Sequence, residues 1–405
     1  MVEIEELRRR IVNNADITRN LSDDDLREII TQMVIEEYRD CHLSLKEKMQ
    51  MSKDLFNNIR GLDVLEELLA NDKITEIMVN GYQQIFVEVD GKIHKYDKAF
   101  SSKEKLLDII QTIVAKANKR VNETTPIVDT RLEDGSRVNV VLNPIAINGP
   151  IVTIRKFYKK ALTMDDLIAY GSITNEAALF LKKLVVNGYN IFISGGTGSG
   201  KTTFLNVLSN YIPKDERIIT IEDSAELKLE NIENLVSLEC REANTEGENE
   251  VTIRDLIKTS LRMRPNRIVV GEVRGPEALD MLQAMNTGHD GSLSTGHANS
   301  PYDMLTRLET MVKMASDIPL EAIRNQIAQA VEIMVHLGRL KDGSRKVLEI
   351  SEVVGCENGH ILLSPIYLYK EPTRYGNEEG NYGKLEFTGN SLRKYKGNLS
   401  RYDKT

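Results

Sequence analysis

A glycine-rich turn stands between an apolar run and a helical pattern near the middle of this chain. The turn reads Gly195-Gly196-Thr197-Gly198-Ser199-Gly200-Lys201-Thr202, which fits the phosphate-loop pattern G-x-x-x-x-G-K-[ST]. Glycines let backbone N–H groups surround a phosphate, and the helix that follows, from Thr203, turns its positive end toward the same anion. We therefore predict a nucleoside triphosphate site over Gly195 to Thr203. Lys201 should reach the β- and γ-phosphates, and the Thr202 hydroxyl should bind magnesium.

The composition is that of a globular protein with two or three domains, since 405 residues exceed one ordinary core. A net charge of -8 argues against a general nucleic-acid binder, because such proteins carry a basic surplus. No apolar run approaches the roughly 20 residues of a membrane span, and the start lacks the features of a secretory signal. We therefore expect a cytoplasmic protein. Cys41, Cys240 and Cys356 are too widely spaced to suggest a disulfide framework or a cysteine zinc site.

The sequence pattern divides the chain into five segments. Residues 1–58 place apolar side chains at helical spacing and predict a small helical bundle. Residues 61–160 combine amphipathic helices with alternating strands and predict an α+β domain. After a linker at 161–173, residues 174–363 alternate strand and helix, which predicts an α/β domain with a mostly parallel sheet. Residues 364–405 are rich in Gly, Asn, Lys and Tyr and predict a loosely attached polar tail.

An acidic residue ends the strand-like run Ile268-Val269-Val270-Gly271-Glu272. The run resembles the second signature of phosphate-loop NTPases, the Walker B strand, but Gly271 stands where an aspartate would hold magnesium. Glu272 is the remaining carboxylate. In a parallel sheet it would face the phosphate loop, where it could polarise an attacking water. A simple glutamate at the end of a strand is the alternative.

A second acidic group ends the strand-like run 217–222. Glu222 and Asp223 are adjacent carboxylates, and Glu226 follows three residues later. Because the carboxyl ends of parallel strands meet at one edge, we expect these acids beside the nucleotide. With Gly271 unable to bind a metal, Glu222 or Asp223 is the expected magnesium ligand, directly or through water.

Two histidines lie in the small-residue stretch 288–299, namely His289 and His297. A zinc site is one interpretation, but no third strong ligand stands at a useful spacing. A hydrogen-bonding phosphate sensor at the end of a strand is the simpler one. For His289 a purely structural role is a further alternative.

Four motifs, in their order along the chain, resemble the secretion ATPases of the type II and type IV pilus superfamily. They are the phosphate loop, the acidic group, the Gly-Glu strand end and the histidine stretch. The closest resemblance is to the CpaF-like branch that drives tight-adherence pili. Residues 130–141 and the run Ile154-Arg155-Lys156-Phe157 also suggest that branch. The likeness extends from about Gly61 to about Gly355. The cysteine-rich zinc insertion of many type II secretion members is missing, which disfavours their branch.

The resemblance implies a fold, a cofactor and partners. It implies a RecA-like C-terminal ATPase domain behind the N-terminal domain, a homohexameric ring, and ATP with Mg²⁺ bound at the cleft between the domains. Arg131, Arg137 and Arg155 match the arginines with which the family completes the γ-phosphate site, although ordinary surface ion pairs are the alternative. It also implies peripheral attachment to an inner-membrane platform protein at the cytoplasmic face, with no nucleic acid expected.

These features together predict an ATP-hydrolysing ring motor that assembles a pilus, with or without retracting it, or drives type II-like secretion. Lys201, Glu272 and His297 would carry the chemistry, with the three arginines as a phosphate clamp. A DNA-translocating RecA-like ATPase is one alternative, and DNA-stimulated hydrolysis would favour it, but the chain has no tryptophan to stack on bases. A nonhydrolysing nucleotide-dependent scaffold is another, and measurable turnover would exclude it.

Overall fold

The structure is a computed structural model. The chain divides into two compact units, residues 1–159 and residues 160–405. We call them the N-terminal and the C-terminal unit. The described residues are 7, 11, 23–39, 41, 43–59, 61–89, 91–157, 162–241, 243, 248–371 and 383–396.

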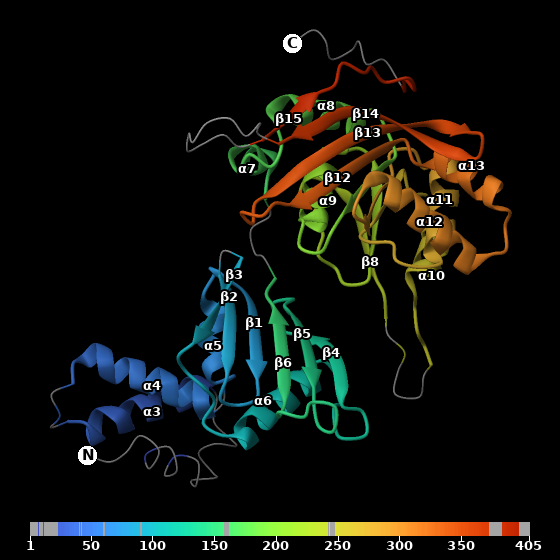
Figure 1. Ribbon diagram of the computed structural model, residues 1–405. Helices are drawn as coiled ribbons and strands as arrows, with labels where there is room; N and C mark the ends of the chain where they lie inside the picture. The colour runs from blue at the N-terminus through green and yellow to red at the C-terminus, as the bar shows by residue number, and fades with distance from the viewer. Residues whose placement is uncertain are drawn as a thin grey trace. The chain divides into compact units, whose positions relative to one another are not determined.

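The N-terminal unit has helices on one side of a six-stranded antiparallel sheet (Figure 1). Its elements are α3 (Asp23–Glu37), α4 (Leu45–Ile59), α5 (Val64–Ala70), β1 (Ile74–Asn80), β2 (Ile85–Val89), β3 (Lys92–Tyr96), α6 (Lys103–Lys116), β4 (Ile127–Arg131), β5 (Arg137–Val141) and β6 (Ile151–Arg155).

The six strands run in the order β3-β2-β1-β6-β5-β4 and alternate between two unlike faces. Val138, Val152 and Ile77 belong to the inner face, where they form one core with apolar residues of α5 and α6. Side chains of the other face are half-buried or exposed and include most of the charged strand residues. A sheet with one covered face gives the period-two pattern that the sequence displays.

The helices α3 and α4 pack against each other at the start of the chain. Leu26, Ile30 and Val34 of α3 meet Leu55 and Phe56 of α4 in a small core. Leu7 and Ile11 belong to the same core, so it joins three stretches of the predicted bundle. The other residues before Asp23 lie outside the described part of the chain.

The C-terminal unit is built on a nine-stranded sheet (Figure 1). Its elements are α7 (Met164–Ala169), α8 (Asn175–Val186), β7 (Ile191–Gly195), α9 (Lys201–Ser209), β8 (Arg217–Glu222), β9 (Asn234–Glu239), α10 (Ile253–Ser260), β10 (Arg267–Val270), α11 (Glu277–Asn286), β11 (Leu293–His297), α12 (Pro301–Ala315), α13 (Leu320–Ala330), β12 (Ile333–Arg339), β13 (Arg345–Glu357), β14 (His360–Lys370) and β15 (Lys384–Phe387).

Strand order explains where a ligand belongs in this unit. The order is β15-β14-β13-β12-β7-β11-β10-β8-β9, and the strands from β12 to β9 are parallel. Helices α7, α8 and α9 pack on one face, and α10 to α13 pack on the other. The predicted α/β fold class is therefore confirmed. β7 is buried along its whole length, as the apolar run before the glycine-rich turn predicts.

Short polar residues set where the helices begin. Thr163 and Thr252 each form a capping box, in which the threonine hydroxyl accepts from the backbone three residues later. Ser300 caps α12 in the same way, and Pro301 follows at the first helical position. None of the helices in the described ranges has the length and apolarity that crossing a membrane requires.

The chain after residue 363 differs from the predicted loose tail. β14 pairs with β13 as far as Leu368, and β15 pairs with β14 as far as Lys370 and adds a further antiparallel strand to the sheet. Composition misleads here because a few apolar residues carry the packing among many polar ones. Ile366, Tyr367 and Leu385 are all at most 5% exposed and join the main core of the unit.

The last described segment, residues 391–396, also lies against the unit, and we call it the C-terminal strap. The Glu352 carboxylate, which is fully buried, accepts hydrogen bonds from the backbone N–H groups of Arg393 and Lys394 at 2.6–3.0 Å. Lys396 Nζ lies 2.8 Å from a carboxylate oxygen of Glu332, which is 6% exposed. The strap thus satisfies two buried charges.

We predict that a chain ending at Asn390 is much less stable than one ending at Lys396, which keeps every contact named above. Removing the strap leaves the carboxylates of Glu332 and Glu352 buried without these donors, a change that costs about 3 kcal/mol or more. Urea denaturation of the two truncated chains measures the difference. Equal midpoints would show that the strap contributes no stability.

Candidate functional site

Neighbouring parallel strands bring the predicted motifs to one edge of the C-terminal unit. The glycine-rich turn follows β7, His297 ends β11, Glu272 follows β10, and Glu222 ends β8. These four strands are adjacent in the order β7-β11-β10-β8, and His297 lies directly opposite Gly195 in the register of β11 and β7. The carboxyl edge of the sheet is the ligand-binding edge of such folds.

Two glycines of the turn are required by geometry. A Cβ on Gly195 would lie 2.5 Å from the carbonyl oxygen of Leu337 in β12, so only glycine fits there. Gly200 has a φ of +92°, a left-handed conformation that other residues rarely adopt. In contrast, a Cβ on Gly196 would meet nothing within 4 Å. The pattern therefore marks a close backbone crossing and a left-handed entry into α9.

Lys201 is held inside the turn. Its side chain is 7% exposed, and Nζ donates to the carbonyl oxygens of Gly195 at 3.1 Å and Gly196 at 2.9 Å. Gly200 caps α9 without a side-chain acceptor, so the helix offers its first N–H groups to an anion. Thr202 is half-buried and Thr203 is exposed beside them.

A chain of contacts links Lys201 to the predicted catalytic acid. Lys201 Nζ lies 3.2 Å from His297 Nδ1, and His297 Nε2 lies 2.8 Å from Glu272 Oε1. An ammonium has only donors, so Nδ1 must accept, and the ring proton of a neutral His297 is then on Nε2, the atom that faces Glu272. The structure thus brings Lys201, His297 and Glu272 together.

The electrostatics favour that neutral form of His297. Burial lowers its pKa below the ordinary value, and the cations Lys201, Arg274 and Arg307 act in the same direction, while Glu272 opposes them. A second histidine, which sequence reasoning missed, shares this environment. His336 of β12 is 7% exposed, its Nδ1 lies 2.9 Å from Ser194 Oγ, and burial lowers its pKa as well.

Arg274 is another residue that sequence reasoning missed. Its Nη2 donates to Glu272 Oε2 at 2.7 Å, while Glu272 Oε1 lies 2.8 Å from His297 Nε2. Glu277 orders the turn that carries Arg274, because its carboxylate accepts from the backbone N–H groups of Arg274 and Gly275. The only feature of the local sequence that points to this residue is an arginine two residues after Glu272.

The acidic group divides into two roles. Glu222 is 3% exposed, and its carboxylate accepts from the backbone N–H groups of Glu226 and Leu227 at 2.9–3.3 Å. It also fills the space beside Gly271, where a Cβ would lie 3.0 Å from Glu222 Cγ. Asp223 is open to solvent, with a side chain 68% exposed that lies 3.9 Å from Arg274.

The donor set at this edge fits magnesium rather than zinc. A threonine hydroxyl and a carboxylate, as in Thr202 and Asp223, are the oxygen ligands that Mg²⁺ takes while it keeps several waters. Glu222 is committed to backbone donors and supports the loop that carries Asp223. Over the ranges that the structure describes, no three His, Cys, Asp or Glu side chains are grouped in a way that could hold a metal.

His289 lies away from this cluster. It precedes β11, whereas His297 is the last residue of that strand, so the two histidines lie toward opposite ends of β11. His289 Nδ1 lies 3.2 Å from the carbonyl oxygen of Ala284, near the end of α11. The structure therefore gives His289 a helix-end contact and does not bring it to the glycine-rich turn.

The three predicted arginines form one row on the N-terminal unit. Arg131 of β4 lies opposite Arg137 of β5, which lies opposite Arg155 of β6. Glu76 and Glu88 continue the same row across β1 and β2. Burial and the neighbouring Glu88 raise the pKa of Glu76, while Arg155 opposes that shift. Like charges opposite each other on a sheet are destabilising, so an anion beside this row would be stabilised.

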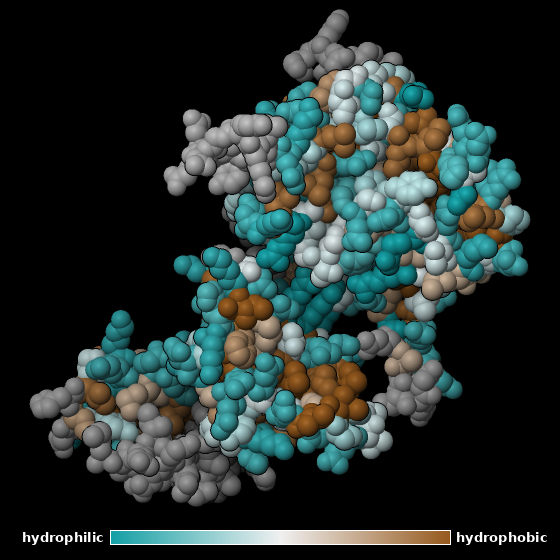
Figure 2. Space-filling view, viewed as in Figure 1, coloured by the Kyte–Doolittle hydropathy of each residue, from teal (hydrophilic) through white to brown (hydrophobic). Residues whose placement is uncertain are grey.

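The same face of the N-terminal sheet becomes apolar toward its other end. Ile127, Val141 and Ile151 lie opposite one another there, and Ile145 and Ile147 are exposed in the loop before β6. Figure 2 shows the corresponding brown area over β4, β5 and β6. The basic row is therefore a localised feature of this face.

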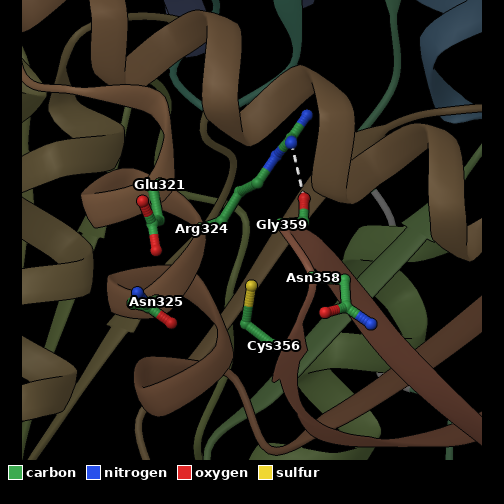
Figure 3. A pocket seen from close by; sticks show the side chains of 6 residues that line it. All are labelled: Glu321, Arg324, Asn325, Cys356, Asn358 and Gly359. Carbon is green, nitrogen blue, oxygen red and sulfur yellow. Dashed lines mark hydrogen bonds between the residues drawn. The ribbon is translucent and has the colours of Figure 1, made fainter.

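A separate hollow of about 510 Å³ lies far from the phosphate loop in the fold, between α13 and the β13–β14 turn (Figure 3). Its lining residues are Glu321, Arg324, Asn325, Cys356, Asn358 and Gly359. Arg324 is already engaged, since it donates to the Glu309 carboxylate and to the carbonyl oxygen of Gly359. This hollow offers no free cation for a phosphate.

Comparison with known sequences agrees with this geometry. A family model described as "Type II/IV secretion system protein" matches residues 58–364. The type IV secretion system protein VirB11 of Brucella suis is 32% identical over 320 residues, which cover 72% of this chain and 88% of that protein. The conjugal transfer protein TrbB of Rhizobium radiobacter is 33% identical over 302 residues, covering 74% and 89% respectively.

Solved structures share the fold at lower identity. The ATPase DotB of Legionella pneumophila has a TM-score of 0.52 at 21% identity, covering 71% of this chain and 79% of that one. The pilus retraction motor PilT has a TM-score of 0.52 at 18% identity, covering 75% and 81%. The predicted RecA-like fold with a preceding N-terminal domain is thereby confirmed.

The buried His336 and the half-buried His297 predict how stability depends on pH. His297 and His336 have lowered pKa values in the folded chain, whereas unfolded histidines take up protons near pH 6.5. Unfolding therefore binds protons below about pH 6.5, and the free energy of unfolding should fall as the pH is lowered through that value. Urea denaturation at pH 7.5 and at pH 5.5 measures this.

The variant His336→Asn should show a smaller loss of stability between the two pH values than the unchanged chain. His94→Asn is the matched control, because His94 is exposed on β3. An identical pH dependence in all three proteins would contradict the assignment of buried neutral histidines.

Proposed function

Because the chain belongs to the type II/IV secretion system protein family, we propose that it is an ATP-hydrolysing motor of a pilus or secretion machine. One observation carries the proposal, namely the unbroken contact path from Lys201 through His297 to Glu272 at the phosphate loop. The phosphate-binding lysine and a carboxylate able to activate water are thereby coupled through one side chain. A pure nucleotide-binding scaffold has no need of that coupling.

Each residue has a role in the proposed hydrolysis. The loop from Gly195 to Thr203 binds ATP, and Lys201 contacts its β- and γ-phosphates. Glu272 orients and polarises the attacking water. Lys201 turned toward a phosphate would give up its contact with His297 Nδ1, so His297 would report nucleotide occupancy to Glu272. When Mg²⁺ is bound it neutralises phosphate charge, and Thr202 with Asp223 would hold it, supported by Glu222.

The arginine row would complete the phosphate site. Arg131, Arg137 and Arg155 present three guanidinium groups in one line, a concentration of charge that suits an anion. We infer that these guanidinium groups bind the γ-phosphate of ATP and stabilise its charge in the transition state. Ordinary surface pairs would not need three arginines in register.

The working assembly would be a homohexameric ring that acts on an inner-membrane platform protein from the cytoplasmic face. The motifs at 130–141 and 154–157 favour a CpaF-like motor of a tight-adherence pilus. A second candidate rests on the relatives named for conjugal transfer and type IV secretion, which favour the same motor in a secretion machine of that type. The net charge of -8 argues against the chain itself gripping DNA.

The proposed function predicts that ATP turnover depends on Glu272 and on assembly. Glu272→Gln should lower turnover by about 100-fold or more, because an amide cannot accept the proton of water. Turnover per subunit should rise to a plateau with protein concentration while mass measurements show the ring forming. Glu230→Gln, which changes an exposed carboxylate, should behave as the unchanged chain. Full turnover by proven monomers would contradict the ring mechanism.

The arginine row predicts a separate defect in catalysis. Arg137→Gln should reduce turnover by about 1,000-fold while ADP binding stays within a factor of about three, because an arginine at the γ-phosphate acts mainly in the transition state. Lys95→Gln removes a cation from the same sheet face outside the row and should leave turnover unchanged. If Arg137→Gln turned over ATP as fast as Lys95→Gln, the arginine row would have no role in catalysis.

A further inference from the structure

The β-hairpin formed by β12 and β13 lies against the phosphate loop. β12 runs parallel to β7 with Leu337 opposite Gly195, and β12 continues two residues beyond that point to Arg339. The chain then turns and returns as β13, which begins at Arg345 opposite Arg339. The crossing is so close that the Leu337 carbonyl oxygen is what excludes a side chain at position 195.

Arg345 makes a direct hydrogen bond to the loop. Its Nε donates to the carbonyl oxygen of Gly198 at 2.9 Å, across 147 residues of sequence. Its Cδ would lie 3.5 Å from a Cβ placed on Gly200, so the arginine stem covers that glycine as well. Gly198 has a φ of +70°, and no atom lies within 4 Å of the position that its Cβ would take. Arg345 is therefore the side chain that fixes the middle of the loop.

The hairpin that carries Arg345 is itself well anchored. Asp342 Oδ1 accepts from the Ser344 backbone N–H at 2.8 Å, and Leu340 and Ser344 close the turn with a backbone bond of 2.8 Å. On the next residue, Lys346 Nζ donates to the Gly171 carbonyl oxygen at 2.7 Å. An arginine mounted on such a turn loses little freedom when it bonds the loop, so the contact is pre-organised.

We propose that Arg345 is a positioning residue of the nucleotide site, which holds the Gly198 carbonyl outward so that the phosphate loop keeps its anion-binding shape. Carbonyl oxygens repel a phosphate, and the loop turns those of Gly195, Gly196 and Gly198 onto internal donors. Lys201 satisfies the first two and Arg345 the third. This inference rests on the proposed function, because it concerns the same ATP site.

Isosteric variants can separate the hydrogen bond from the charge. Gln places its Nε2 donor the same number of bonds from the backbone as the Nε of Arg345, but without charge. Met has the same length without a donor, and Lys keeps the charge. If Arg345 acts by holding Gly198, Arg345→Met should weaken ADP binding by about tenfold, whereas Arg345→Gln should stay within about threefold. The probe is a fluorescent ADP displaced by ADP or ATP.

The hydrogen bond is present before and during reaction, so its loss should raise KM and leave kcat at saturating ATP within about twofold. Lys341→Ala removes a cation from the same hairpin, where Lys341 is exposed, and should change neither value. Because Arg345 is also exposed, all variants should keep the melting temperature of the unchanged chain.

Three results would overturn the inference. Recovery of binding by Arg345→Lys but not by Arg345→Gln would mean that the loop requires the positive charge and that a neutral hydrogen bond to Gly198 is not sufficient. If Arg345→Met and Lys341→Ala bound ADP equally well, the contact between Arg345 and Gly198 would contribute nothing to binding. A loss of binding in Lys201→Ala would still support the ATP site in that case. If Lys201→Ala bound nucleotide as well as the unchanged chain, the proposed function would fail first, and the role of Arg345 with it.

Discussion

The arrangement of the whole C-terminal unit depends on β7 lying between two parallel strands, β11 and β12. That pairing aligns Gly195 with His297 on one side and with Leu337 on the other. The backbones approach so closely that a Cβ at position 195 would meet the Leu337 carbonyl oxygen at 2.5 Å. Because β11 and β12 end at the same edge of the sheet as β7, the glycine-rich turn, His297 and the hairpin that carries Arg345 all lie at that edge.

This edge concentrates charge at a cost to stability. Lys201 is nearly buried and depends on carbonyl oxygens and a neutral histidine for partners, while Glu272 is shared between His297 and Arg274. The arginine row of the N-terminal unit places like charges on three adjacent strands. Such groupings cost stability unless opposite charges compensate them, and a bound anion is one such compensation.

The sequence predicts what is encoded locally. The buried strand β7, the turn at 195–202 and the acids at strand ends carry short patterns with a physical reason, and the structure has them. It does not predict His336 or Arg345, because their contacts with Ser194 and Gly198 span 142 and 147 residues. It does not predict Arg274 either, because a single arginine in a turn belongs to no pattern. It also misjudges the end of the chain, where the donors for Glu352 come from the backbone of residues 393 and 394, a signal that no side-chain pattern carries.

The state of Glu272 decides whether the cluster can act as a base. Its Oε2 accepts from Arg274, and its Oε1 lies 2.8 Å from His297 Nε2, while a carboxylate has room for about four donors. A water can therefore bond to it without displacing either partner. His297 is the partner that depends on Lys201, and a phosphate that draws Lys201 away would act on the base through this one ring.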